Sequence, residues 1–125
     1  MDGTVIFAYT REQALTDRAL VDVSEMAAEA GFAVPVAVTR ALWADIETIP
    51  ASHAWQDVNG RLWDVLWMAS CAIRMNQGEK GADRTMLRYR LILATEAGDD
   101  YIVKLVSGPG DAGEHVITLM KPDED

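Results

Sequence analysis

The first third of the chain alternates short apolar runs with polar breaks, a pattern typical of small mixed elements. The run TVIFAY at 4–9 is β-branched and aromatic, which predicts a strand ending at Tyr9. Thr10 and Gln13 have the spacing of a capping box, so we expect a short helix from there to Thr16-Asp17. The apolar run ALVDV then predicts a second short strand at 19–23.

Residues 24–50 predict two more helices and a strand. Ser24 is expected to cap a helix that ends at Gly31, because glycine readily adopts the left-handed backbone found after helices. The run FAVPVAV at 32–38 contains Pro35, which has no amide proton to donate, so its strand is expected at a sheet edge. Thr39 is expected to cap the helix RALWADIE, which ends before Pro50. Its apolar side is formed by Leu42, Trp43 and Ile46.

A polar loop closing on Asn59-Gly60 leads into a long helix predicted from Arg61 to about Asn76. Its apolar residues fall in three stripes almost all round the helix, which predicts burial on more than one side. Leu66, Ala69 and Ile73 are expected to be nearly inaccessible to solvent. Two tryptophans, Trp63 and Trp67, form one of the stripes, and either the chain's own first half or a second molecule covers them.

After the polar connector QGEKGAD the hydrophobic period changes from 3.6 to 2. In MLRYRLIL the leucines and Tyr89 fall on one face while Arg88 and Arg90 fall on the other, as in a half-buried strand. Strands are also expected at 101–106 and 115–120, joined by the turn EAGDD and the loop SGPGDAGE. Short connections between successive strands predict an antiparallel meander.

These elements predict one α+β domain over 1–125. Short mixed N-terminal elements precede one long central helix, which packs on a C-terminal three-stranded antiparallel meander. The tail, 121–125, is expected to be frayed. A chain of 125 residues is long enough to bury about two-thirds of its unfolded surface, which is consistent with a single domain.

The charge is strongly acidic and unevenly distributed. Twenty acidic residues against eleven basic ones give a formal net charge of −9. The acids lie mainly before residue 61 and after residue 95, whereas the segment between them is basic. This field disfavours direct nucleic-acid binding and permits attraction to a basic protein surface. Acidity that merely keeps the protein soluble is the alternative.

No targeting signal or membrane-length apolar run is visible, so we expect a cytoplasmic protein that does not enter a membrane. Cys71 is the only cysteine, which excludes an intramolecular disulfide. It lies among apolar residues of the long helix, so a core thiol is expected rather than a nucleophile. His53 and His115 are far apart and lack a ligand-spaced partner, so no metal site and no cofactor is predicted.

Other polar motifs have a simpler structural interpretation. The loop GPGDAG lacks the Lys-Ser/Thr pair of a phosphate-binding loop and is expected to be a hairpin loop. Acid pairs such as Asp22 with Glu25 are expected to be solvated. Arg84, Arg88 and Arg90 either form an exposed strand face or recognise an anion. No catalytic residue is predicted.

Several long phrases resemble a known family. YTREQALTDRALVDVSEMAAEAGFAVPVAVTRALW, GRLWDVLWMASCAIR and KLVSGPGDAGEHVITLMKPDED are similar to a family of small bacterial proteins associated with plasmids, integrative elements and phage. That family has no assigned activity, so the resemblance implies no catalytic residue. Its members commonly read Asp-Gly where this chain has Asp17-Arg18.

The resemblance and the charge together suggest a non-enzymatic accessory protein of a mobile element. Such a protein would bind a host or element protein, for instance as an acidic inhibitor of a nucleic-acid-binding defence or regulatory complex. Its expected contact residues lie in acidic turns near the C-terminus: Asp99, Asp100, Asp111 and Glu114. The alternative is a small enzyme or ligand-binding domain with an unrecognised site. A homodimer through an edge strand or the tryptophan helix is also open.

Overall fold

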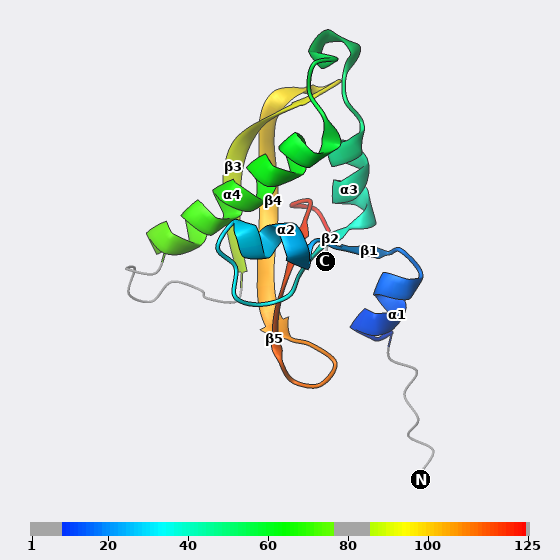
Figure 1. Ribbon diagram of the computed structural model, residues 1–125, viewed down its shortest axis with the longest axis vertical. Coiled ribbons are helices and arrows are strands. Elements are labelled where there is room, and N and C mark those ends of the chain that lie inside the picture. Colours follow the sequence, from blue (N-terminus) through cyan, green and yellow to red (C-terminus); the bar gives the residue numbers. More distant parts are fainter. Residues whose placement is uncertain (1–8, 77–85, 125) are drawn as a thin grey trace.

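The computed structural model describes residues 9–76 and 86–124 and folds them around one five-stranded sheet (Figure 1). The predicted strand at 4–9, apart from Tyr9, and the connector with Arg84 lie outside the described residues. The elements in chain order are α1 (Arg11–Thr16), β1 (Leu20–Asp22), α2 (Ser24–Glu29), β2 (Val36–Thr39), α3 (Arg40–Glu47), the 3₁₀ turn η1 (Ala51–His53), α4 (Val58–Asn76), β3 (Met86–Thr95), β4 (Gly98–Pro109) and β5 (His115–Met120).

The strand order is β1-β2-β5-β4-β3. The predicted C-terminal meander is confirmed, since β3 pairs with β4 and β4 with β5 in antiparallel register. The N-terminal strands extend this sheet: β2 adds parallel to β5, and β1 adds antiparallel to β2. The sheet therefore has five strands, two more than the meander expected from the sequence. The sequence pattern did not indicate the two added strands, because the parallel pairing joins segments about eighty residues apart.

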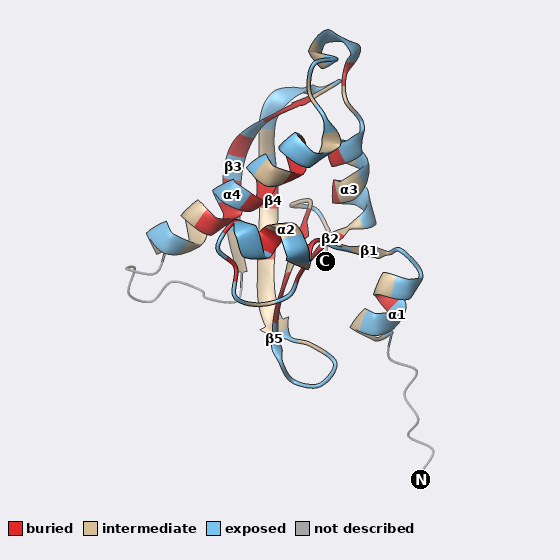
Figure 2. Ribbon diagram, viewed as in Figure 1, coloured by how far each residue is buried: buried red, intermediate tan, exposed pale blue. Residues whose placement is uncertain are grey.

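Helices α2, α3 and α4 pack on one face of the sheet (Figures 1 and 2). The core between them comes from alternate strand residues, because successive side chains in a strand point to opposite faces. On the terminal strand these are Tyr89, Leu91 and Leu93, all buried, whereas Arg88 and Arg90 are exposed as predicted. The Tyr89 hydroxyl also donates to the Val65 carbonyl of α4 at 2.8 Å, which fixes helix and strand together.

The long helix is only partly covered. Leu66 and Ala69 are fully buried as predicted, but Ile73 is only half-buried. Trp63 packs against the core, whereas 43% of the Trp67 side-chain and backbone surface stays exposed. The predicted burial on several sides is thus wrong for Trp67, Met68 and Met75, because no described element covers that side of α4 (Figure 2).

Helix boundaries follow local capping. The capping box of Thr10 and Gln13 is present, and Thr39 caps α3 as predicted. Ser24 is not the predicted cap: it is the first residue of α2, and its hydroxyl instead contacts the Asp22 carboxylate at 2.6 Å. The long helix begins at Val58 rather than Arg61, because the Asp57 carboxylate accepts from the Gly60 amide at 2.6 Å and caps an earlier turn.

Other expectations are corrected by tertiary contacts. The strand after Pro35 lies inside the sheet, not at its edge; Pro35 precedes β2, so its missing donor removes no bond within that strand. β4 extends to Pro109, through residues expected to be loop. The segment 121–124, where fraying was expected, is anchored: the Glu124 carboxylate accepts from the Thr39 hydroxyl at 2.7 Å and from the Lys121 amide at 2.8 Å.

Candidate functional site

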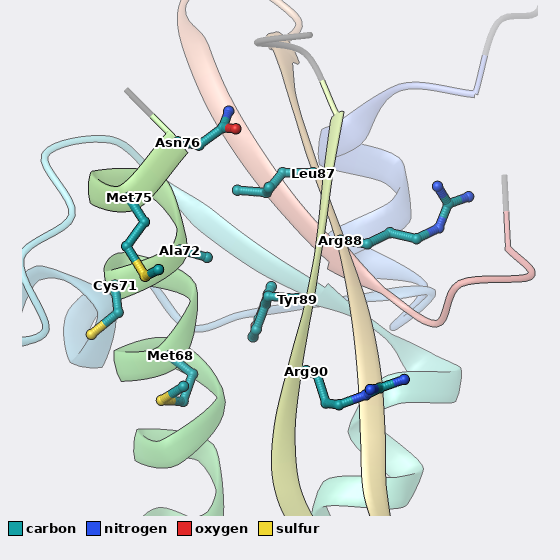
Figure 3. Close-up of a pocket in the computed structure, with 9 residues that line it drawn as sticks. All are labelled: Met68, Cys71, Ala72, Met75, Asn76, Leu87, Arg88, Tyr89 and Arg90. Carbon is teal, nitrogen blue, oxygen red and sulfur yellow. The ribbon is translucent and has the colours of Figure 1, made fainter. Parts of the chain in front are cut away.

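A groove lies between α4 and the terminal strand β3. A hollow of about 350 Å³ lies between the C-terminal half of α4 and residues 87–90 of β3 (Figure 3). A second hollow, of about 530 Å³, lies between Asp64 and Trp67 of α4 and residues 90–92 of β3. Met68 and Arg90 line both hollows, so they form one continuous surface, which we call the α4–β3 groove.

Apolar side chains line this groove and remain in contact with solvent. Met75 is 80% exposed and Ile92 is 79% exposed, while Trp67 and Met68 are close to 40% exposed. The Trp67 ring stacks on Trp63 with centroids 5.9 Å apart, and the Arg74 guanidinium lies 5.4 Å from the Trp67 ring centre. These contacts hold Trp67 in place but leave its outer side open, as is typical of an interface residue.

Cys71 belongs to this groove and not to the core. It is half-buried, and its sulfur accepts from the Arg74 guanidinium at 3.4 Å. In Figure 3 its side chain lies on the same side of the helix as Met68 and Met75. The predicted core thiol is therefore wrong, because the helix turns this side away from the sheet.

The four acidic candidates from the sequence are not brought together. Asp99 and Asp100 lie at the start of β4, beside the β3–β4 turn. Asp111 and Glu114 lie in the β4–β5 loop at the other end of that strand (Figure 1). Asp100 forms an ion pair with Arg90 at 3.0 Å. Asp99 and Asp100 thus lie in a strand and not in the predicted turn, and only these two border the groove.

The loop acids have intramolecular roles. The two Asp111 oxygens accept from the backbone amides of Glu12 at 2.9 Å and Arg11 at 2.8 Å, so this carboxylate caps α1. These bonds hold the pKa of the Asp111 carboxyl below its ordinary value. Glu114 accepts from the Ala112 amide at 3.0 Å within the GPGDAG loop, which is a hairpin loop as predicted.

A second surface lies beside the β3–β4 turn, where Glu96 joins Asp99 and Asp100. We call these three exposed residues the acidic hairpin end. Glu96 and Asp100 border a hollow of about 430 Å³ against the end of α3. Its floor contains the Tyr101 hydroxyl, which donates to the Asp45 carboxylate at 2.5 Å, and Lys121, which pairs with the same carboxylate at 3.2 Å.

The polar groups on the floor of this hollow bind one another through hydrogen bonds and an ion pair. Burial and the adjacent Asp45 carboxylate raise the pKa of Tyr101, so its phenol stays protonated at neutral pH. Asp45 has two partners, and Lys121 is occupied by it. The cluster ties α3 to β4 and to the end of β5, and it was not predicted because its members come from three distant parts of the sequence.

Arg61 is a buried charge behind the same hollow. It is 2% exposed and donates to the carbonyls of Ile46 at 2.7 Å and Asp45 at 2.8 Å, and to the Gln56 side chain at 2.9 Å. Burial lowers the pKa of its guanidinium, while Asp45 and other nearby groups oppose this shift. Its position at the C-terminus of α3 matches the negative end of the helix dipole, so its role is structural.

The remaining candidates show no reactive arrangement. His53 is bonded to the Ser52 hydroxyl at 2.9 Å and lies 4.8 Å from the Trp55 ring, while His115 opens β5. Within the described residues, no three His, Cys, Asp or Glu side chains gather in a way that would hold a metal ion. None of the described helices is long and apolar enough to cross a membrane.

A known protein family matches the chain. The model of a family of unknown function, DUF6573, matches residues 1–125, the whole chain. The chain belongs to the DUF6573 family. No curated protein and no solved structure matches it. For this DUF6573 protein, the function must therefore be argued from its own surfaces.

Proposed function

We propose that this protein is a non-enzymatic accessory protein that binds a basic segment of another protein at its acidic hairpin end. The observation that carries the proposal is the position of three exposed carboxylates beside the β3–β4 turn: Glu96 and Asp100 border one hollow, and Asp99 and Asp100 border another. Among residues 9–76 and 86–124, a basic partner is present only for Asp100, and its ion pair with Arg90 is about two-thirds exposed. Exposed carboxylates such as these are available to a cationic group of a partner.

The surface has the composition of a partner-binding site. Exposed carboxylates lie next to the apolar side chains of Trp67 and Ile92, and this pairing of an apolar centre with a polar rim is typical of protein interfaces. The overall charge of −9 adds a field that attracts a basic protein and accelerates encounter. Both features favour a basic protein over nucleic acid as the partner.

The biological setting that we propose follows the sequence resemblance to proteins of plasmids, integrative elements and phage. An acidic accessory protein of a mobile element would bind a nucleic-acid-binding host or element protein and block it, with carboxylates occupying positions that phosphates otherwise take. We place this action in the cytoplasm. Asp111 and Glu114 are omitted from the proposed contact, because they cap α1 and close the β4–β5 loop.

The test is an affinity capture from lysate of the bacterium that encodes the protein. The wild type is compared with the variant Glu96→Gln/Asp99→Asn/Asp100→Asn. The matched control, Glu25→Gln/Glu29→Gln/Glu47→Gln, removes the same charge from exposed positions elsewhere. We expect a basic protein to be captured by the wild type and by the control and to be lost with the hairpin variant.

Two results would refute the proposal. One is the absence of any basic partner at low salt. The other is equal loss in the hairpin and control variants, which would show that only the overall charge matters. Circular dichroism of all three proteins establishes that each one is folded.

A further inference from the structure

The hollow beside the acidic hairpin end already contains a cation of the chain itself. We call this hollow of about 430 Å³, between the end of α3 and the β3–β4 turn, the hairpin hollow. Lys121 lines it, and its ammonium group pairs with the Asp45 carboxylate at 3.2 Å. Glu96 and Asp100, to which we assign the binding of a basic partner, line the same hollow. The lysine ammonium therefore lies where a cation of that partner would be bound.

The contacts of segment 121–124 hold the backbone of Lys121 in this position. Lys121 directly follows β5, which ends at Met120. Its amide donates to the Glu124 carboxylate at 2.8 Å, and the same carboxylate accepts from the Thr39 hydroxyl at 2.7 Å. The lysine side chain, in contrast, is a flexible stem with a single charge at its end. The ammonium group can therefore leave Asp45 while the backbone stays in place.

The ion pair is accessible to a partner and weakly held. The side chains of Lys121 and Asp45 are 37% and 31% exposed. A pair of this kind changes an equilibrium constant by up to about fivefold. The Lys121 ammonium and the Tyr101 hydroxyl both bind the same oxygen of Asp45, Oδ2, and within residues 9–76 and 86–124 no bond is formed to Oδ1. Asp45 would therefore be a further carboxylate for a partner once the lysine has moved.

We propose that Lys121 is an autoinhibitory cation, whose ammonium group occupies the Asp45 carboxylate in the hairpin hollow until a basic partner displaces it. This inference rests on the proposed function, because it concerns the regulation of the same site. The displaced ammonium lowers the affinity for a basic partner in two ways. It keeps Asp45 from the partner's cation, and it repels that cation from Glu96 and Asp100 on the rim.

The test is an NMR titration of the isotope-labelled full chain with a hexalysine peptide at low salt. Lys121→Met keeps the apolar stem and removes the charge, and we expect it to bind hexalysine about threefold to fivefold more tightly than the wild type does. Arg88→Met is the matched control, because it removes one positive charge from an exposed position on β3 outside the hollow. Its affinity for hexalysine should stay within about twofold of the wild-type value.

A second comparison locates the gain at Asp45. The double variant Asp45→Asn/Lys121→Met removes one charge of each sign, so it has the net charge of the wild type. The asparagine oxygen can still accept from the Tyr101 hydroxyl. We expect this double variant to bind hexalysine as the wild type does. The proposal is overturned if Lys121→Met gains no more than Arg88→Met, if the gain persists in the double variant, or if hexalysine binds neither the wild type nor Lys121→Met.

Failure of the proposed function gives a different result. The hairpin variant Glu96→Gln/Asp99→Asn/Asp100→Asn would then bind hexalysine as tightly as its matched control does. If only the autoinhibitory role of Lys121 is wrong, the hairpin variant still loses binding, while Lys121→Met gains none. The dispersion of the amide signals in each NMR spectrum shows whether the variant is folded.

Discussion

The clearest energetic prediction concerns Arg61, whose guanidinium donates hydrogen bonds to backbone carbonyls at the C-terminal end of α3. Replacing it with methionine keeps the length of the apolar stem and removes every donor. The carbonyls of Asp45 and Ile46 and the side-chain oxygen of Gln56 would then lose their hydrogen bonds inside the protein. Each buried acceptor left without a donor costs about 1–3 kcal/mol.

Part of this cost is returned, because the buried guanidinium itself no longer has to be desolvated. We therefore expect Arg61→Met to lower the free energy of unfolding by about 3–4 kcal/mol, which is roughly 10–15 °C in Tm for a domain of this size. Arg61→Lys should cost less, because one ammonium group reaches some of these acceptors. Gln56→Ala, which removes one acceptor, should cost about 1 kcal/mol.

The assay is urea unfolding followed by circular dichroism and by tryptophan fluorescence, at one fixed protein concentration. Coincident transitions with an unchanged slope would show that the three variants differ in stability and not in the extent of unfolding. If Arg61→Met costs less than about 1 kcal/mol, the carbonyls at the end of α3 do not depend on the guanidinium. The structural role assigned to Arg61 would then be wrong.

Three further predictions concern the fold. Leu66→Ala should cost about 2–5 kcal/mol in urea unfolding, and Ile73→Ala less, because Leu66 is fully buried and Ile73 only partly; equal costs would contradict the packing. The pKa of Asp111 is lowered in the folded state, so its stabilising effect is present above about pH 4, the ordinary pKa of aspartate, and is lost as the pH falls through the folded value. The difference in stability between the wild type and Asp111→Asn should therefore disappear in acid, and a constant difference would refute the capping role. Arg18 has a positive φ of 64°, so Arg18→Gly should raise the free energy of unfolding by about 0.5–1 kcal/mol, and a decrease would show that the side chain is needed there.

Local patterns predicted the secondary structure well, because caps and periodicity act over a few residues. The meander, the capping box of α1, the Thr39 cap of α3 and the long helix all follow from such patterns. The place of β2 inside the sheet does not, since its parallel pairing with β5 joins Val36 to Ile117. The exposure of Met75 at the end of α4 could not be predicted either. Periodicity shows which side of a helix is apolar, but not whether another element covers that side.

The candidate site could be predicted only in part. Asp99 and Asp100 are neighbours in sequence, so their shared place at the start of β4 is local. The capping of α1 by Asp111 joins residues about a hundred positions apart, and no sequence pattern indicates it. The same is true of the contact between Tyr101 and Asp45. Arg18 keeps the turn that glycine favours, which shows that the flanking helix α1 and strand β1 impose this backbone conformation on an unfavourable residue.

The most direct test of the central claim is the affinity of the captured partner for the wild type and for Glu96→Gln/Asp99→Asn/Asp100→Asn, measured by calorimetry at several salt concentrations. Exposed ion pairs contribute up to about 1 kcal/mol each and are screened by salt. The account predicts a Kd about tenfold weaker for the variant at low salt, with a smaller dependence on salt than for the wild type. An unchanged Kd with the same salt dependence would contradict the claim that the acidic hairpin end binds the partner.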